Sequence, residues 1–159
     1  MKNPNQRPTT NSNRSMPPGV VIPELAYTDV RKATEWLCRS FGFKERLRIG
    51  DHRVQLSFGE GSVIVTQQPV DPVHSSSDAS SLHTTTSVTP GISMMVRVAD
   101  ANSHFEHVRL SGARIINPPT DYPYGERQYT VEDIGGYQWT FSQTIADIDP
   151  GVWGGSLVE

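Results

Sequence analysis

The alternation of hydrophobic and polar residues between Asp121 and Phe141 predicts two β-strands joined by a turn. The apolar positions of this alternation are Tyr129, Val131, Tyr137, Trp139 and Phe141. The pair Gly135-Gly136 between the two runs supplies the turn. Each strand therefore has one apolar face for a core and one polar face that is free for a ligand.

Two helices are predicted by apolar residues at helical spacing, each after an aspartate that can cap it. Asp29 precedes a helix from about residue 30 to 41, and Asp100 precedes one that runs to about Leu110. Gly42 and Gly112 follow the two helices as stop signals. Further strands are expected at 20–27, 44–49, 53–58, 62–68, 92–98 and 113–116, with a loop at 117–123.

The two halves of the chain share one order of elements: a strand, an Asp cap, a helix, a closing glycine and then strands. This internal repeat predicts an α+β fold of two βαβββ modules whose sheets enclose a cleft. The modules are expected at residues 20–68 and 92–145. Flanking segments are a flexible N-terminal arm at 1–19, a Ser/Thr-rich loop or linker at 69–91 and a C-terminal tail at 146–159, where Trp153 is a candidate to dock on the body.

Composition narrows the classes of partner. The chain of 159 residues has 14 Lys+Arg against 17 Asp+Glu, a net charge of −3, and no basic stripe of the kind that follows phosphates. We therefore expect no nucleic acid as partner. The longest apolar runs are strand-sized, which predicts neither a membrane span nor a signal peptide and favours a cytoplasmic protein.

Short motifs stand around the first helix and in the second half. They are Tyr27-Thr28-Asp29-Val30, Trp36-Leu37, Phe41-Gly42-Phe43, Tyr124-Gly125-Glu126-Arg127, Asp133-Ile134-Gly135-Gly136 and Tyr137-Gln138-Trp139-Thr140-Phe141. These motifs resemble those of the vicinal oxygen chelate superfamily, the group of glyoxalase, bleomycin-resistance and extradiol-dioxygenase proteins. The resemblance covers roughly residues 20–155 and implies a homodimer, because members of this family commonly pair.

Metal-dependent members of the family hold a divalent ion with His, Gln or Glu from the first and last strand of each module. The resemblance places these four positions at Ile22, Val65, Met94 and Thr140. None of these side chains is a competent ligand for such an ion, so we expect no metal and no cofactor.

The histidines do not supply a replacement set. His104 and His107 lie three residues apart on one predicted helix, where a solvated face is the favoured interpretation. His74 and His83 lie in the predicted loop, and a site assembled from loop histidines on folding stays open.

Strand alternation predicts a mainly apolar small-molecule site with a few polar groups. The predicted ligand-binding residues are Ile22, Glu24, Val65, Gln67, Met94, Val96, Tyr124, Arg127, Gln138 and Thr140. Glu24 is the carboxylate of this set and would serve as general acid or base in an enzyme, or else be a strand-end glutamate in water. Arg127 would clamp a carboxylate or phosphate of the ligand, or form a surface pair with Glu126. Tyr124 would stack on a flat ring of the ligand, or belong to the core.

Two classes of function follow. The first is a metal-independent small-molecule-binding protein of the bleomycin-resistance type, which holds an apolar or aromatic ligand such as a natural product between the modules. The alternative is an enzyme of the same fold: an isomerase, lyase or cyclase that uses Glu24, or a glyoxalase-like metalloenzyme if the metal positions are shifted in register.

Overall fold

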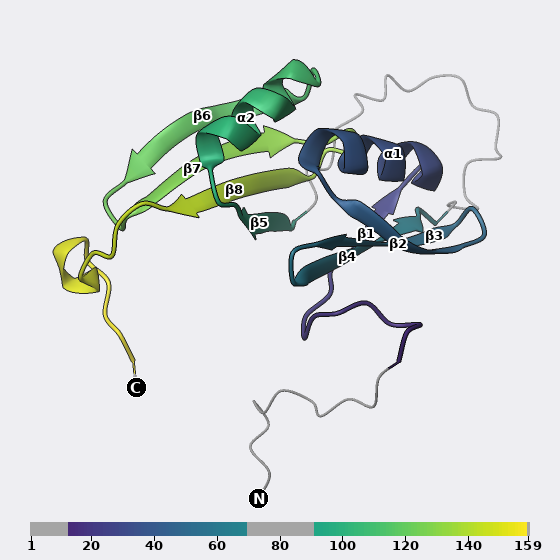
Figure 1. Cartoon of the computed structure of the whole chain (residues 1–159), viewed down its shortest axis with the longest axis horizontal. Coiled ribbons are helices and arrows are strands. Elements are labelled where there is room, and N and C mark those ends of the chain that lie inside the picture. Colours follow the sequence, from purple (N-terminus) through teal and green to yellow (C-terminus); the bar gives the residue numbers. More distant parts are fainter. Residues whose placement is uncertain (1–12, 70–90, 159) are drawn as a thin grey trace, which may run out of the picture. The chain divides into compact units, whose positions relative to one another are not determined.

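The computed structural model describes residues 13–69 and 91–158, which belong to two compact units. The first unit contains β1 (Glu24–Tyr27), α1 (Val30–Phe41), β2 (Lys44–Ile49), β3 (Arg53–Phe58) and β4 (Gly61–Gln67). The second contains β5 (Ser93–Arg97), α2 (Ala101–Leu110), β6 (Arg114–Tyr122), β7 (Glu126–Glu132), β8 (Gln138–Thr144) and the 3₁₀ turn η1 (Pro150–Val152). The predicted α+β fold of two βαβββ modules is confirmed (Figure 1).

Each unit is one helix packed on one four-stranded mixed sheet. The strand orders are β1-β4-β3-β2 and β5-β8-β7-β6. In both sheets the first strand pairs in parallel with the last, and the other pairs are antiparallel. Figure 1 shows each helix lying along its own sheet. We call the side that packs on the helix the helix-covered face and the opposite side the helix-free face.

The aspartates predicted to cap the helices do so. An Asp29 carboxylate oxygen accepts the Lys32 amide at 2.9 Å, and an Asp100 oxygen accepts the Ser103 amide at 2.9 Å. Gly42 ends α1 in the left-handed conformation, with φ of 86°. The start and stop signals in the sequence therefore set the bounds of α1, which match the predicted ones.

The core of the second unit lies between α2 and the helix-covered face of its sheet. Phe141 stands opposite Tyr129, and Trp139 stands opposite Val131. All four side chains are at most 1% exposed. The ring centroid of His104, on α2, lies 4.3 Å from that of Phe141, which identifies this side of the sheet as the one that the helix covers.

The first unit has the same construction. Leu25 stands opposite Val65, which stands opposite Val54, and all three are at most 1% exposed. Phe58 shares the face of Val54, because the two residues are four positions apart along β3, and it lies near Gly42 at the end of α1. The strongly amphipathic α1 therefore covers the Leu25 side of this sheet.

A buried carboxylate organises the turn between β7 and β8. Asp133 is 5% exposed, and its Oδ1 accepts the amides of Gly135 at 2.8 Å and Tyr137 at 3.0 Å. Its Oδ2 accepts the indole N–H of Trp139 at 2.8 Å. One side chain thus satisfies donors from the turn, from the residue before β8 and from the core.

The segment after β8 is fastened to the turn between β6 and β7. The carbonyl of Gly125 accepts the amides of Ile145 at 2.8 Å and Ala146 at 3.1 Å. Gly125 has φ of 84°, and a Cβ built there would lie 2.1 Å from the Ala146 carbonyl oxygen. Only glycine fits this crossing without movement of the backbone.

Two predictions of element bounds need correction. The loop predicted at 117–123 is wrong, because β6 runs to Tyr122. Pro118 and Pro119 lack N–H donors, but β6 is an edge strand with register shifts on both sides of Asn117, which accommodates them. The strand predicted at 20–27 begins only at Glu24, after Pro23.

Other predicted segments fall partly beyond the described residues. Most of the predicted linker at 69–91 and residues 1–12 of the predicted arm lie outside them. Among the helices of residues 13–69 and 91–158, none combines the length and the apolar character needed to cross a membrane.

The first prediction concerns Asp133. Replacement by alanine is expected to lower the free energy of unfolding by about 3 kcal/mol, because the Tyr137 amide and the Trp139 indole lose a buried charged acceptor. Asp133→Asn should cost less, since it retains one acceptor oxygen. The control is Asp149→Ala, which removes an exposed turn acceptor for Gly151 and should cost below about 1 kcal/mol. Urea unfolding followed by circular dichroism measures all three, and equal losses for Asp133→Ala and Asp149→Ala would contradict the assignment.

The second prediction compares two glycines with nearly equal backbone angles. Gly136 has φ of 85°, and nothing lies within 4 Å of a Cβ built on it. Gly136→Ala should therefore cost about 1 kcal/mol of unfolding free energy from backbone strain alone. Gly125→Ala adds a steric clash and should cost roughly 3 kcal/mol or more. Thermal and urea unfolding of the two variants provide the comparison, and similar costs would show that the crossing at Ala146 is not tight.

Candidate functional site

Three of the predicted ligand-binding residues lie on helix-free faces. Glu24 stands opposite Ile64 in the first unit. Gln138 and Thr140 alternate with the buried Trp139 in the second, so they point away from α2. Their alternation follows the sequence pattern, and their role as ligand contacts stays a prediction.

Four others lie on helix-covered faces, so their predicted position facing the ligand is wrong. Val65 stands opposite Leu25 and is 0% exposed. Met94 stands opposite Trp139 and is 7% exposed. Residues paired across neighbouring strands point to the same side of a sheet, so Gln67 and Val96 also lie on the helix-covered faces. Gln67 stands opposite Tyr27, and Val96 stands opposite Phe141.

The surroundings of Glu24 differ from the apolar site that was expected. Its carboxylate forms an ion pair with Arg53, and its side chain is 51% exposed. Ile22 is half-buried just before β1 and lies beside Gly19. Glu24 therefore has a cationic partner and access to water, and the apolar enclosure predicted for a general acid or base is wrong.

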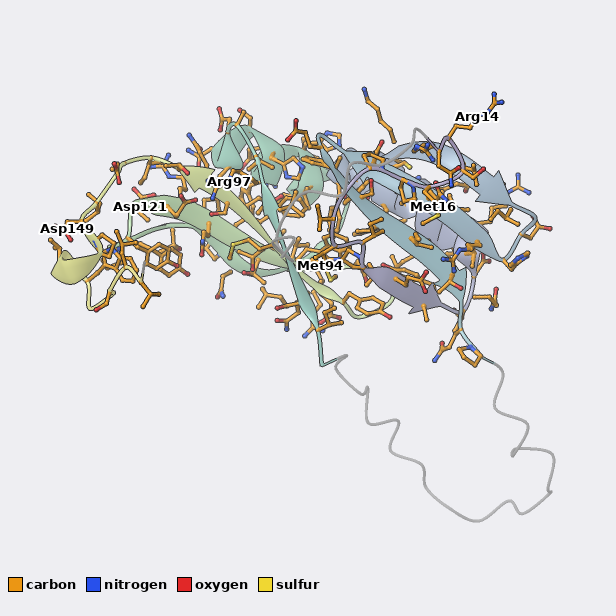
Figure 2. All side chains as sticks on the ribbon, turned by 90° about the horizontal axis from the view of Figure 1, so that it is seen from below. Arg14, Met16, Met94, Arg97, Asp121 and Asp149 are labelled. Carbon is orange, nitrogen blue, oxygen red and sulfur yellow. The ribbon has the colours of Figure 1, made fainter. Side chains whose placement is uncertain are left out.

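The helix-free face of the first sheet is covered by the residues that precede β1. The Gln55 amide nitrogen donates to the Ser15 carbonyl at 2.9 Å, and Arg46 donates to the Arg14 carbonyl at 2.8 Å. Gln55 is 3% exposed, although it lies on the side opposite α1. Figure 2 shows Arg14 and Met16 beside the strands of this unit. We call residues 13–17 the N-terminal strap.

A carboxylate collects hydrogen bonds on the helix-free face of the second sheet. Glu126 Oε2 accepts the Ser142 hydroxyl at 2.6 Å, and Oε1 accepts the Thr144 hydroxyl at 2.6 Å. Arg97 Nη1 lies 3.5 Å from Oε1 and also donates to the Thr144 hydroxyl. The hydroxyls of Ser142 and Thr144, with the charge of Arg97, hold the pKa of Glu126 below its usual value. Three strands thus converge on one ionised carboxylate.

The chain of hydrogen bonds continues to the turn between β6 and β7. Gln128 Nε2 donates to the Ser142 hydroxyl at 3.0 Å. The Tyr124 hydroxyl donates to Gln128 Oε1 at 3.1 Å. Further along the same face, the Thr130 and Thr140 hydroxyls lie 3.1 Å apart. The polar groups of this face are therefore largely satisfied by one another.

Three aromatic rings gather at the Tyr124 end of this network. Tyr122 and Tyr124 are stacked, with centroids 5.3 Å apart and ring planes 16° apart. Trp153 meets Tyr124 edge-on at 5.7 Å, which confirms that the tail docks on the body. Tyr124 is 36% exposed and Trp153 is 42% exposed. Partial burial raises the pKa of the Tyr124 hydroxyl, so it remains a donor at neutral pH.

Arg127 does not join this cluster. Its guanidinium forms two hydrogen bonds to Asp121, at 2.6 and 3.0 Å. It alternates with Gln128 along β7 and shares the side of Tyr129, which is the side of α2. Of the two interpretations left open by the sequence, the surface ion pair is the one that the geometry supports, although its partner is Asp121 and not Glu126.

The residues that the resemblance places at the metal positions do not form a site for a divalent ion. Val65 and Met94 are buried under the helices, and Thr140 is paired with Thr130. Within residues 13–69 and 91–158, no group of three His, Cys, Asp or Glu side chains is arranged to hold a metal ion. His104 packs on Phe141 and contacts the Tyr129 hydroxyl, so its predicted place on a solvated face is wrong.

Several residues of the network escaped the sequence analysis. Arg97, Gln128 and Tyr122 were not among the predicted site residues. The sequence of β5 contains a pattern that could have predicted Arg97: Ser93, Met95 and Arg97 alternate along the strand, so the two polar residues point to the same side as Met95. Tyr122 was hidden by the prediction of a loop at 117–123.

Comparison with known proteins gives a family and a fold. Residues 20–141 match the family model of the Glyoxalase/Bleomycin resistance protein/Dioxygenase superfamily. A comparison with curated proteins finds no match. The crystal structure of TioX from Micromonospora sp. ML1 is similar, with 34% sequence identity, a TM-score of 0.60, and coverage of 77% of this chain and 96% of that chain.

Two further structures share the fold at lower identity. UcmS2 is 16% identical with a TM-score of 0.58, over 80% of this chain and 98% of that chain. A glyoxalase/bleomycin resistance protein/dioxygenase from Nocardioides is 17% identical with a TM-score of 0.58, over 94% of this chain and 93% of that chain. The family model spans well over half of the sequence and agrees with the observed modules. The chain therefore belongs to the Glyoxalase/Bleomycin resistance protein/Dioxygenase superfamily.

Proposed function

We propose that this protein binds an apolar or aromatic small molecule without a metal ion, on the helix-free face of its second sheet. The observation that carries the proposal is the cluster of Tyr122, Tyr124 and Trp153 beside a polar network that is satisfied internally. Partly exposed aromatic rings offer stacking surface at a low cost in side-chain entropy. An apolar ligand placed there leaves few polar groups without partners.

The contrast between the two sheets supports this location. In the first unit, backbone carbonyls of the N-terminal strap accept hydrogen bonds from Gln55 and Arg46 on the helix-free face. In the second unit, the corresponding face exposes Met95 by 66%, next to Thr140 on the neighbouring strand. A flexible thioether beside partly exposed polar groups suits a surface that accepts a bulky ligand.

The enzyme alternative has weaker support. It depended on Glu24 as a desolvated acid or base, and Glu24 is half-exposed and paired with Arg53. The metalloenzyme version depended on ligands at the four family positions. A shift of register by one residue moves the positions in β4 and β5 to Ile64, Thr66, Ser93 or Met95, which lie on the helix-free faces and carry no imidazole or carboxylate. In β1, the carboxylate of Glu24 lies on that face and is paired with Arg53.

The cellular role that fits a binding protein of this family is sequestration of a toxic natural product. Bleomycin resistance is part of the family description. The same proposal includes a cytoplasmic location, which the strand-sized apolar runs favour, and a homodimer, which the resemblance implies. Light scattering on the purified protein would test the dimer.

The third prediction tests metal-free binding. After dialysis against EDTA, the protein should bind the fluorescent aromatic dye 8-anilino-1-naphthalenesulfonate, and added Zn²⁺, Ni²⁺ or Mn²⁺ should leave the affinity unchanged. Tyr124→Ala should weaken binding about fivefold to tenfold, because it removes the central ring of the cluster. The measurement is dye fluorescence titrated against protein.

The matched control is Leu110→Ala on α2, which removes a side chain that is 76% exposed and stands apart from the aromatic cluster. It should leave the affinity of the dye unchanged. Binding that appears only after a metal is added would contradict the proposal, as would equal weakening by Leu110→Ala and Tyr124→Ala.

A further inference from the structure

The hydrogen bonds of the Glu126 network have a common direction. Ser142 and Thr144 both donate to Glu126, and Gln128 donates to Ser142. At the far end, the Tyr124 hydroxyl donates its proton to Gln128. Each hydrogen bond in this series therefore donates in the direction of Glu126, and both carboxylate oxygens of Glu126 already accept hydrogen bonds from protein groups.

Arg97 is the member of the network with donors to spare. Its Nη1 serves Thr144 and lies 3.5 Å from Glu126, and its side chain is 72% exposed. A guanidinium has five N–H groups, so the exposed remainder can donate to a further acceptor. Figure 2 shows Arg97 at the strands of the second unit. At the Glu126 end of this face, the exposed guanidinium therefore offers hydrogen-bond donors to a ligand.

The register sets the spacing between the backbone of Arg97 and the backbone of Gln128, which contacts the aromatic cluster. Arg97 stands opposite Ser142, which stands opposite Gln128, so two strand spacings separate Arg97 from Gln128. Two such spacings amount to about 10 Å. The Tyr124 hydroxyl lies 3.1 Å from Gln128 Oε1, which places the ring cluster at the other end of this span. The guanidinium of Arg97 itself extends over β8 to within 3.5 Å of Glu126 Oε1 on the strand of Gln128, so one molecule of two or three fused rings with one substituent can contact both the donor and the rings.

We propose that the ligand is a fused planar aromatic molecule with a carboxylate or carbonyl acceptor, with its rings against Tyr124 and Trp153 and its acceptor on Arg97. This inference rests on the proposed function and specifies the chemical class that the site selects. Arginine donates to a carboxylate through a planar pair of N–H groups, which gives orientation as well as affinity. The ring cluster supplies affinity without selecting charge.

A cationic aromatic ligand is the opposite case, and the geometry disfavours it. Glu126 would be its natural partner, but this side chain is only 16% exposed and its two oxygens accept Ser142 and Thr144. A cation would also approach the charge of Arg97. The preference between acid and amine is therefore a property that the network itself predicts.

The test uses two probes with the same rings, anthracene-2-carboxylate and 2-(aminomethyl)anthracene, titrated against the full chain with tryptophan quenching and calorimetry. The carboxylate is expected to bind about tenfold more tightly than the amine, the size of one charge-assisted hydrogen bond. Arg97→Gln should remove this preference, with the loss confined to the carboxylate. Trp153→Ala should weaken both probes together, as read by calorimetry.

The control for Arg97 is Arg114 on the same face. Arg114 is also 72% exposed and pairs with Glu132, which lies six residues from Glu126 along β7. That separation is about 20 Å, so Arg114→Gln should leave both affinities unchanged. Equal affinity for the two probes, or equal effects of Arg97→Gln and Arg114→Gln, would overturn the acceptor assignment while leaving aromatic binding in place. Binding of neither probe would overturn both this inference and the proposed function.

Discussion

The buried carboxylate of Asp133 is the contact on which the second unit depends. It joins the turn after β7 to the indole of Trp139 at the start of β8. Because successive strand residues face opposite sides, a slip of one position would turn Trp139 away from α2. Holding Trp139 in place also holds Thr140 and Ser142 on the helix-free face. The polar network thus inherits its position from a hydrogen bond on the other side of the sheet.

The two units show how one plan can be finished in two ways. Both bury an apolar face under a helix, and both leave a helix-free face that must satisfy its polar groups. In the first unit, Gln55 and Arg46 donate to backbone carbonyls of the N-terminal strap. In the second, the side chains around Glu126 satisfy one another, and the tail adds Trp153 at the edge. The second face therefore remains the more accessible of the two.

The polar side chains around Glu126 form hydrogen bonds with one another, and this lowers the cost of covering them with a ligand. A network whose donors and acceptors are paired costs little when an aromatic ligand displaces water from above it. Selectivity then comes from the few groups with capacity left, and the exposed guanidinium of Arg97 is such a group. The fold by itself does not choose among the many chemistries that it supports, so function depends on this arrangement of side chains.

Local patterns in the sequence were sufficient to predict most of the helices and strands, the helix caps and the repeat. Asp29, Gly42 and Asp100 predicted helix bounds because capping is local, and Tyr129 with Phe141 predicted the buried face of the hairpin because their neighbours are polar. Helix caps and strand alternation depend on residues a few positions apart, so a single chain displays them. The family resemblance rested on the same local motifs.

Tertiary contacts determine which side chains of β4 and β5 face the helix, and which carboxylate forms the ion pair with Arg127. The apolar residues of β4 are buried on both sides of the sheet: α1 covers one side, and Ile64 is sheltered on the other. Because Val63, Ile64 and Val65 are all apolar and buried, the sequence of β4 shows no alternation of polar and apolar residues here. Met94 and Met95 are both apolar, and pairing with β8 alone separates the buried one from the exposed one. Strand register and coverage by a distant segment arise between residues far apart in the sequence, which is why local pattern could not predict them. The ion pair of Arg127 with Asp121 forms across the hairpin of β6 and β7, in a segment that was predicted to be a loop.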